Sequence, residues 1–154
     1  METSPQERQP STPARLTPEI ARGLFDAMEA APDPDFSLIE KHYREDVRFQ
    51  DPIQTLEGRE AFIEMTRHLV ERCSELRAQV HYAAGSPEVI FLQWTMEMKI
   101  GPTPLTPIEG ATRLVLDEDG RVKEHRDYFD FWGDSLAAIP GLGAAYRRFM
   151  RLLG

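Results

Sequence analysis

The sequence at positions 125–130 is His125-Arg126-Asp127-Tyr128-Phe129-Asp130. These residues continue an alternation of apolar and polar side chains, so positions 121–131 are expected to form a strand. Successive side chains of a strand point to opposite faces, which puts His125, Asp127 and Phe129 in one row. A histidine and an aspartate are therefore predicted to share a face with a large apolar ring.

An aspartate in such a row needs a partner or a chemical role, because burying an unpaired carboxylate is costly. A second acid, Asp51, ends the alternating run 47–51 on the same face as Phe49. Two carboxyl groups in one apolar pocket can divide the roles of acid and base between them. We therefore predict Asp51 as a base and Asp127 as an acid. His125 is a further candidate because an imidazole exchanges protons near neutral pH.

Each of these residues also has a structural interpretation, and the sequence leaves both open. Asp51 precedes a proline at a strand end, where aspartates often cap a turn through the backbone. A salt bridge with Arg126 or Arg113 would satisfy Asp127 without any chemistry. His125 also fits a hydrogen-bonded histidine that has no catalytic role.

The rest of the chain predicts helices first and strands afterwards. The expected helices are 17–31, 36–44 and 59–76, and the further strands are 77–84, 89–100 and 110–116. The third helix aligns Phe62, Met65, Leu69, Cys73 and Leu76 on one face. The segment Asp117-Glu118-Asp119-Gly120 is typical of a hairpin turn. This order of elements predicts an α+β fold.

The strand at 89–100 is expected to supply the interior. Its even-numbered residues from Ile90 to Met98 are apolar and share one face, with Trp94 and Met96 near the centre. Together with Phe49 and Phe129, they are candidates for the wall of a pocket. Core packing is the alternative, and in a hollow fold the wall and the core coincide.

The bulk properties indicate one domain. A chain of 154 residues fits one domain, in which 1–16 form a disordered tail and 17–154 the folded part, including a C-terminal amphipathic helix at 141–153. The formal net charge of -8 argues against binding to nucleic acid, which is a polyanion. The sequence has neither a secretory signal nor an apolar run long enough to span a membrane, so a cytoplasmic location is expected.

Several chemistries lack the residues that they need. Cys73 is the only cysteine, which excludes an internal disulfide. The four histidines are scattered, so no metal site is expected. A glycine-rich phosphate loop is also absent. The sequence therefore predicts no cofactor.

The C-terminal helix is the least explained segment. Leu142, Tyr146, Phe149, Met150 and Leu153 form an apolar stripe, and it is flanked by Arg147, Arg148 and Arg151. Basic amphipathic helices of this kind can lie on membranes. For so short a helix we prefer packing over the mouth of the domain or against a second subunit.

The chain resembles the SnoaL-like, nuclear transport factor 2-like superfamily over residues 18–132. The similar segments are Gln50-Asp51-Pro52, Gly58-Arg59-Glu60-Ala61-Phe62 and Arg126 to Asp130. Within the superfamily, a second group of similar segments is Gln93-Trp94-Thr95-Met96, Ile108-Glu109-Gly110 and His125 to Asp130. The second group is similar to a bacterial SnoaL-like subgroup without a known activity. The resemblance implies a strongly curved, mixed or antiparallel sheet wrapped around helices. It also implies an internal pocket for a small hydrophobic molecule, and commonly a homodimer.

The resemblance implies candidate roles residue by residue. Asp51 matches the proton-shuttling aspartate of ketosteroid isomerases, whereas the two oxyanion donors of that family fall at Phe25 and Thr112. Asp127 matches the first aspartate of the limonene epoxide hydrolase segment. The arginine and aspartate that should face it fall at Gln93 and Thr95 in the sequence alignment. Phe25 and Thr112 thereby join the expected lining of the pocket.

Two functions follow from these observations. The first is a cofactor-free isomerase, cyclase or hydrolase that uses Asp51 and Asp127 for proton transfer. The second is a non-catalytic protein that binds or carries a hydrophobic molecule, which the missing partner groups favour.

Overall fold

The computed structural model describes residues 14–29, 33–102, 105–130, 133 and 141–153. The helices are α1 (Pro18–Glu29), α2 (Ser37–His42), α3 (Arg59–Arg72) and α4 (Leu142–Leu153). The strands are β1 (Tyr43–Gln50), β2 (Thr55–Glu57), β3 (Cys73–Gly85), β4 (Val89–Ile100), β5 (Thr106–Leu116) and β6 (Val122–Phe129). The α+β class expected from the sequence is confirmed. The expected ends of the first helix and of the last strand, at 31 and 131, lie outside the described residues.

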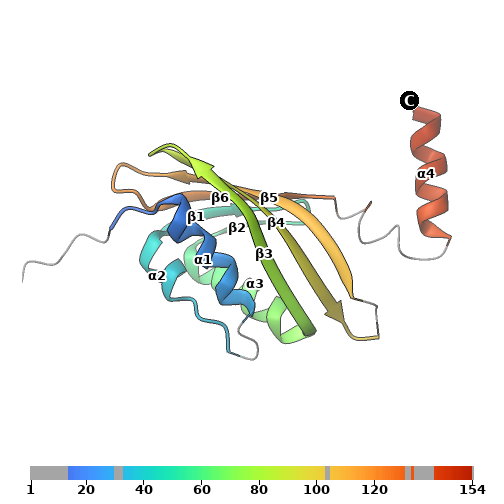
Figure 1. The fold of residues 1–154 in the computed structure, drawn as a ribbon, viewed down its shortest axis with the longest axis horizontal. Coiled ribbons are helices and arrows are strands. Elements are labelled where there is room, and N and C mark those ends of the chain that lie inside the picture. The colour runs from blue at the N-terminus through green and yellow to red at the C-terminus, as the bar shows by residue number, and fades with distance from the viewer. Residues whose placement is uncertain (1–13, 30–32, 103–104, 131–132, 134–140, 154) are drawn as a thin grey trace, which may run out of the picture.

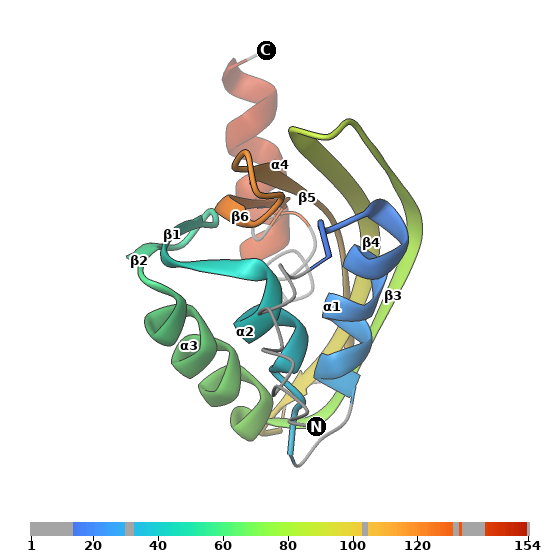
Figure 2. The same cartoon turned by 90° about the vertical axis from the view of Figure 1, so that its left-hand side faces the viewer.

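The strands form one mixed sheet in the order β2-β1-β6-β5-β4-β3. Strand β1 pairs with β6 in parallel, and the other neighbours pair antiparallel. Helices α1, α2 and α3 lie on one side of the sheet, which curves around them without closing (Figures 1 and 2). We call the face toward these helices the inner face and the opposite one the outer face. The curved, mixed sheet implied by the family resemblance is confirmed.

Helix α1 begins where the sequence predicts. The backbone N–H of Ile20 donates to Thr17 Oγ1 at 3.4 Å, and that of Ala21 donates to the Thr17 carbonyl at 2.9 Å. Leu16 is only 2% exposed, and its N–H donates to the carbonyl of Gly120 at 3.1 Å. Arg15 also donates to the carbonyls of Glu118 and Pro87, so the described chain is attached to the domain before the expected boundary at 17.

Two predicted helix ends were wrong. Helix α2 ends at His42, and Tyr43 already begins β1, while α3 ends at Arg72 and Cys73 begins β3. Leu76 therefore lies in a strand, where it pairs with Met98. Apolar residues spaced three or four apart fit a helix, but burial of Leu76 and Ala78 also fits alternation along a strand. Pairing with β4 decides between the two.

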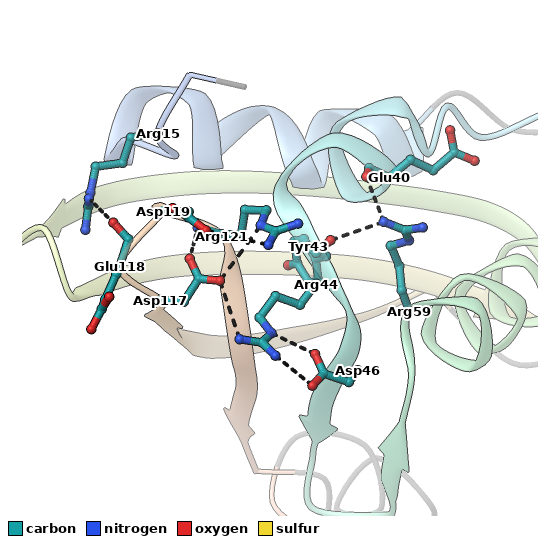
Figure 3. A network of polar contacts seen from close by, with 10 residues as sticks. All are labelled: Arg15, Glu40, Tyr43, Arg44, Asp46, Arg59, Asp117, Glu118, Asp119 and Arg121. Carbon is teal, nitrogen blue, oxygen red and sulfur yellow. Dashed lines mark hydrogen bonds and ion pairs between the residues drawn. The ribbon is translucent and has the colours of Figure 1, made fainter. Parts of the chain in front are cut away.

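The predicted hairpin turn joins β5 to β6 and anchors a polar network (Figure 3). Asp117 Oδ1 accepts a hydrogen bond from the backbone N–H of Arg121 at 2.8 Å, and Oδ2 lies 3.6 Å from Arg44 Nη1. Arg44 also pairs with Asp46 at 2.7 Å. Gly120 closes the turn with a φ of 78°, a conformation that favours glycine. The network ties the start of β1 to the turn before β6.

Candidate functional site

The row predicted from the last strand lies on the inner face. His125 and Asp127 have side-chain exposures of 4% and 17%, and Phe129 is half-buried. The intervening residues Arg126 and Tyr128 point to the outer face, where the guanidinium of Arg126 lies 4.9 Å from the centre of the Tyr128 ring. Alternation along β6 thus places the acid and the histidine inside.

Both ring nitrogens of His125 are hydrogen-bonded. Nδ1 lies 2.8 Å from Tyr43 Oη, and Nε2 lies 2.9 Å from Asp127 Oδ1. Burial, together with the negative charge of Asp127, raises the pKa of Tyr43 well above that of an ordinary phenol. The phenol therefore keeps its proton and can donate it to Nδ1. With Nδ1 as the acceptor, the tautomer of His125 that carries a proton on Nε2 donates it to Asp127 Oδ1.

Thr112 is the second partner of Asp127. It is fully buried and lies directly opposite Asp127 in the pairing of β5 with β6. Its hydroxyl donates to Asp127 Oδ1 at 2.5 Å and accepts from Trp94 Nε1 at 2.9 Å. The hydrogen bonds connect Tyr43, His125, Asp127, Thr112 and Trp94, and we call this set the Asp127 network.

The salt bridge considered for Asp127 does not form with either arginine. Arg126 lies over Tyr128, and Arg113 pairs with Glu124 at 3.3 Å. The partners of Asp127 among the described residues are His125 and Thr112 instead. Both hydrogen bonds end on Oδ1, so one carboxylate oxygen is fixed from two sides.

Aromatic rings surround the network. The ring centre of His125 lies 5.1 Å from that of Phe49 and 5.0 Å from that of Phe62. Trp94 packs between Phe25, at 5.5 Å, and Phe129, at 6.3 Å. Of the residues expected to line a pocket, Phe25, Phe49, Trp94, Met96 and Thr112 are at most 7% exposed. They contribute to the core, and their contact with a ligand stays a prediction.

Asp51 follows the end of β1, beside the inner-face row of β6. Phe49 pairs with His125 in the parallel register, so Asp51 lies at the same end of the sheet as Asp127. Asp51 Oδ1 accepts the backbone N–H groups of Ile53 and Gln54, each at 2.7 Å. The carboxylate therefore caps the turn between β1 and β2, as its structural interpretation predicts. Its role as a base stays a prediction.

Gln93 and Thr95, which the family resemblance aligns with the two missing partners of Asp127, do not face Asp127. Gln93 is exposed on the outer face, and Thr95 Oγ1 lies 2.8 Å from Nε2 of the exposed His81. The inner positions of β4 in this region are Leu92, Trp94 and Met96, all buried. None of these side chains carries a charge, so the arginine and the aspartate are missing at these positions as well.

Sequence reasoning missed Tyr43 as a member of the site because it assigned this residue to a helix. Tyr43 is 1% exposed and shares odd-numbered positions with Val47 and Phe49. The alternation of 47–51 does not extend back to Tyr43, because Glu45 is exposed and the register of β1 against β6 shifts between Tyr43 and Arg48. The pairing of β1 with β6 is what brings its hydroxyl to His125.

The fold, a mixed sheet curved around helices on one face, is shared with solved structures described as NTF2-like. A family model described as a SnoaL-like domain matches residues 21–125, which is more than half of the chain. The chain belongs to this SnoaL-like domain family. Asp127 lies just beyond the matched residues.

Solved structures agree with this fold. A protein from Jannaschia sp. CCS1 that is described as a SnoaL-like polyketide cyclase is 20% identical, with a TM-score of 0.68. The match covers 88% of this chain and 98% of that one. An epoxide hydrolase of the limonene epoxide hydrolase-like type from M. tuberculosis is 18% identical with a TM-score of 0.64, covering 84% and 94%. A protein from Catenulispora acidiphila with a ketosteroid isomerase-like fold, in complex with trimethylamine, is 17% identical with a TM-score of 0.66, covering 79% and 92%. No curated protein sequence matches the chain.

Among the described residues, no group of three histidine, cysteine, aspartate or glutamate side chains is arranged to hold a metal ion. None of the described helices is long and apolar enough to cross a membrane.

Proposed function

We propose that the protein catalyses cofactor-free proton transfer on a small hydrophobic molecule, with Asp127 as the residue that exchanges the proton. The observation that supports this proposal is that one oxygen of the Asp127 carboxylate is held by hydrogen bonds while the side chain stays partly exposed. Oδ1 is held by Thr112 and His125, while the side chain keeps 17% exposure among aromatic rings and buried residues of the inner face. An acid on such a face needs partners or a chemical role. The partners here fix one oxygen and orient the group.

The chemistry would use the two oxygens differently. Thr112 and His125 hold Oδ1, so Oδ2 is the atom that would take a proton from the substrate and return it. In this scheme Tyr43 orients the imidazole of His125, and the hydrogen bonds of Oδ1 with His125 and Thr112 stabilise the ionised carboxylate before transfer. Asp51 would be the second carboxylate, held by its turn at the same end of the sheet.

The substrate classes follow from the relatives. The family includes cofactor-free isomerases, cyclases and epoxide hydrolases, so the substrate would be an apolar carbonyl compound with an acidic C–H bond or an epoxide. A panel of a β,γ-unsaturated ketone, a poly-β-carbonyl compound and a terpene-like epoxide samples these classes. Products are identified by mass spectrometry.

The decisive variant is Asp127→Asn, which keeps the shape of the side chain and removes its basicity. We expect turnover to fall by about a hundredfold or more, the usual contribution of a positioned proton-transfer group. Asp51→Asn tests the second carboxylate in the same assay. Asp119→Asn is the matched control, because Asp119 lies in the exposed β5–β6 turn. Turnover that survives unchanged in Asp127→Asn would refute the proposal.

A second candidate function is binding or carriage of a hydrophobic molecule without chemistry. It is favoured by the inner positions of β4, where Leu92, Trp94 and Met96 offer no charged group to assist Asp127. Native mass spectrometry of the purified protein, followed by recovery of any bound molecule, separates the two candidates. A ligand that returns unaltered after incubation, and that binds equally well to Asp127→Asn, would support carriage.

A further inference from the structure

The outer face of the sheet carries a groove that no described helix covers. The groove measures about 900 Å³, and its lining includes Tyr82, Phe91, Glu109, Tyr128 and Asp130. The three aromatic side chains are 70%, 52% and 41% exposed, in that order. Exposed aromatic side chains gathered in one place are typical of a surface that binds a partner. We call this feature the outer groove.

Helix α4 presents a second uncovered apolar surface. Leu142, Phe149, Met150, Leu152 and Leu153 are between 43% and 78% exposed. The helix lies apart from the other elements, on the side of the sheet away from α1, α2 and α3 (Figures 1 and 2). A helix of 12 residues is marginally stable alone in water and depends on packing of its apolar side. It therefore needs a surface to cover that side.

The charges of the two surfaces are complementary. Helix α4 carries Arg147, Arg148 and Arg151 beside its apolar stripe and contains no acid. The outer groove has acids among its lining residues, Glu109 and Asp130. An apolar helix face that enters a hydrophobic groove, with basic side chains reaching acids at its rim, is a common mode of recognition.

We propose that the occupant of the outer groove is α4 of a second copy of this chain. Among the described residues of one copy, α4 lies apart from the sheet whose outer face carries the groove (Figure 1). A twofold exchange lets each copy place its α4 in the groove of the other, so both helices and both grooves are covered and the assembly closes as a dimer. A membrane would cover the helix but leave the aromatic groove open. The acids of the outer groove, Glu109 and Asp130, therefore favour the basic helix α4 as its occupant.

The first test measures self-association of the full-length chain by sedimentation over a dilution series. Phe149→Glu puts a charge on the apolar side of α4, and Phe91→Glu puts one in the outer groove. Each variant is expected to weaken dimerisation about tenfold or more, as loss of a central aromatic contact does. Tyr82→Glu is a second groove variant, used if Phe91→Glu does not fold. Ile53→Glu is the control, since Ile53 is equally exposed, at 62%, but lies in the turn after β1.

The second test mixes the two variants, one of them isotope-labelled, and counts labelled and unlabelled partners by native mass spectrometry. In an exchanged dimer, Phe91→Glu supplies an intact helix and Phe149→Glu an intact groove. The mixture should therefore form heterodimers more readily than either variant alone forms homodimers. This recovery is specific to exchange between copies.

Other results would overturn the proposal. Dimerisation that survives Phe149→Glu but not Phe91→Glu indicates contact between two sheets, and the reverse pattern indicates contact between two α4 helices. A wild-type chain that stays monomeric at all concentrations indicates a helix docked in its own groove. A monomer that binds anionic lipid vesicles, and loses this binding in Phe149→Glu, indicates a membrane surface.

Discussion

The inner and outer faces of this sheet are made by the same strands but are filled differently. On β4, Trp94 is buried inside, whereas Phe91 is half-exposed outside. On β6, Asp127 has two hydrogen-bond partners inside, whereas Tyr128 is exposed outside beside Arg126. Alternation along a strand therefore separates two roles within neighbouring residues. The inner face carries the polar network within a packed core, and the outer face carries surface for contact.

The largest difference in stability between changes on the two faces is expected when an aromatic ring is removed. Trp94→Ala should lower the free energy of unfolding by about 3–5 kcal/mol, because it leaves a cavity and removes the hydrogen bond to Thr112. Phe91→Ala, on the outer face of the same strand, should cost less than about 1 kcal/mol in the monomer. Chemical denaturation at low protein concentration measures both. Equal losses would mean that the outer face is packed as well.

A smaller effect is expected from removing one hydroxyl on each face. Thr112→Val keeps the shape of the side chain but takes one donor from Asp127 and the acceptor from Trp94, which should cost about 1–3 kcal/mol. Thr95→Val, whose hydroxyl meets the exposed His81, should stay within about 0.5 kcal/mol. Thermal and chemical denaturation of the pair would show whether the Asp127 network contributes to stability. A neutral Thr112→Val would argue that the network is not structural.

The smallest effect concerns pH and a histidine on the inner side. His42 is 1% exposed, and burial, followed by the charge of Lys41, lowers its pKa in the folded protein. The unfolded chain then takes up this proton at a higher pH than the folded one. Stability should fall as pH drops below about 6.5, at most by about 1.4 kcal/mol per pH unit.

The check compares the wild-type protein with His42→Phe between pH 7.5 and pH 5.5, values chosen on both sides of the ordinary histidine pKa of about 6.5. The variant should lose less stability over this interval, while the two proteins differ little in slope above it. An identical pH dependence in both proteins would mean that His42 takes up its proton at the same pH in the folded and the unfolded chain. This result would contradict the lowered pKa of His42 in the folded protein.

The sequence predicted which face of the sheet a side chain lies on better than it predicted which side chains touch. Alternation placed His125 and Asp127 inward because the period of a strand is two, whatever its neighbours. It could not reveal that Tyr43 bonds to His125, since that contact depends on β1 lying beside β6 in parallel. The same alternation turns Gln93 and Thr95 to the outer face, away from Asp127.

Local sequence signals predicted some element ends correctly but not others. Thr17 marks the start of α1 because the cap needs only neighbouring residues. The end of α3 at Arg72 depends instead on pairing of β3 with β4, which joins residues far apart in the chain. For Asp51, the turn signal of the following proline was the better guide to its contacts, since its carboxylate binds two backbone N–H groups.

The position of β6 has a consequence for folding. This strand is the last one in the chain, yet it lies between β1 and β5 in the sheet. Before it is synthesised, β1 and β2 have no pairing with β3, β4 and β5, so the sheet exists as two separate parts. The hydrogen bond between Tyr43 and His125 spans 82 residues and can form only when the two parts join. Contacts of such length slow folding. Joining the sheet and assembling the Asp127 network are therefore the same late event, and a chain cut before residue 121 would have neither.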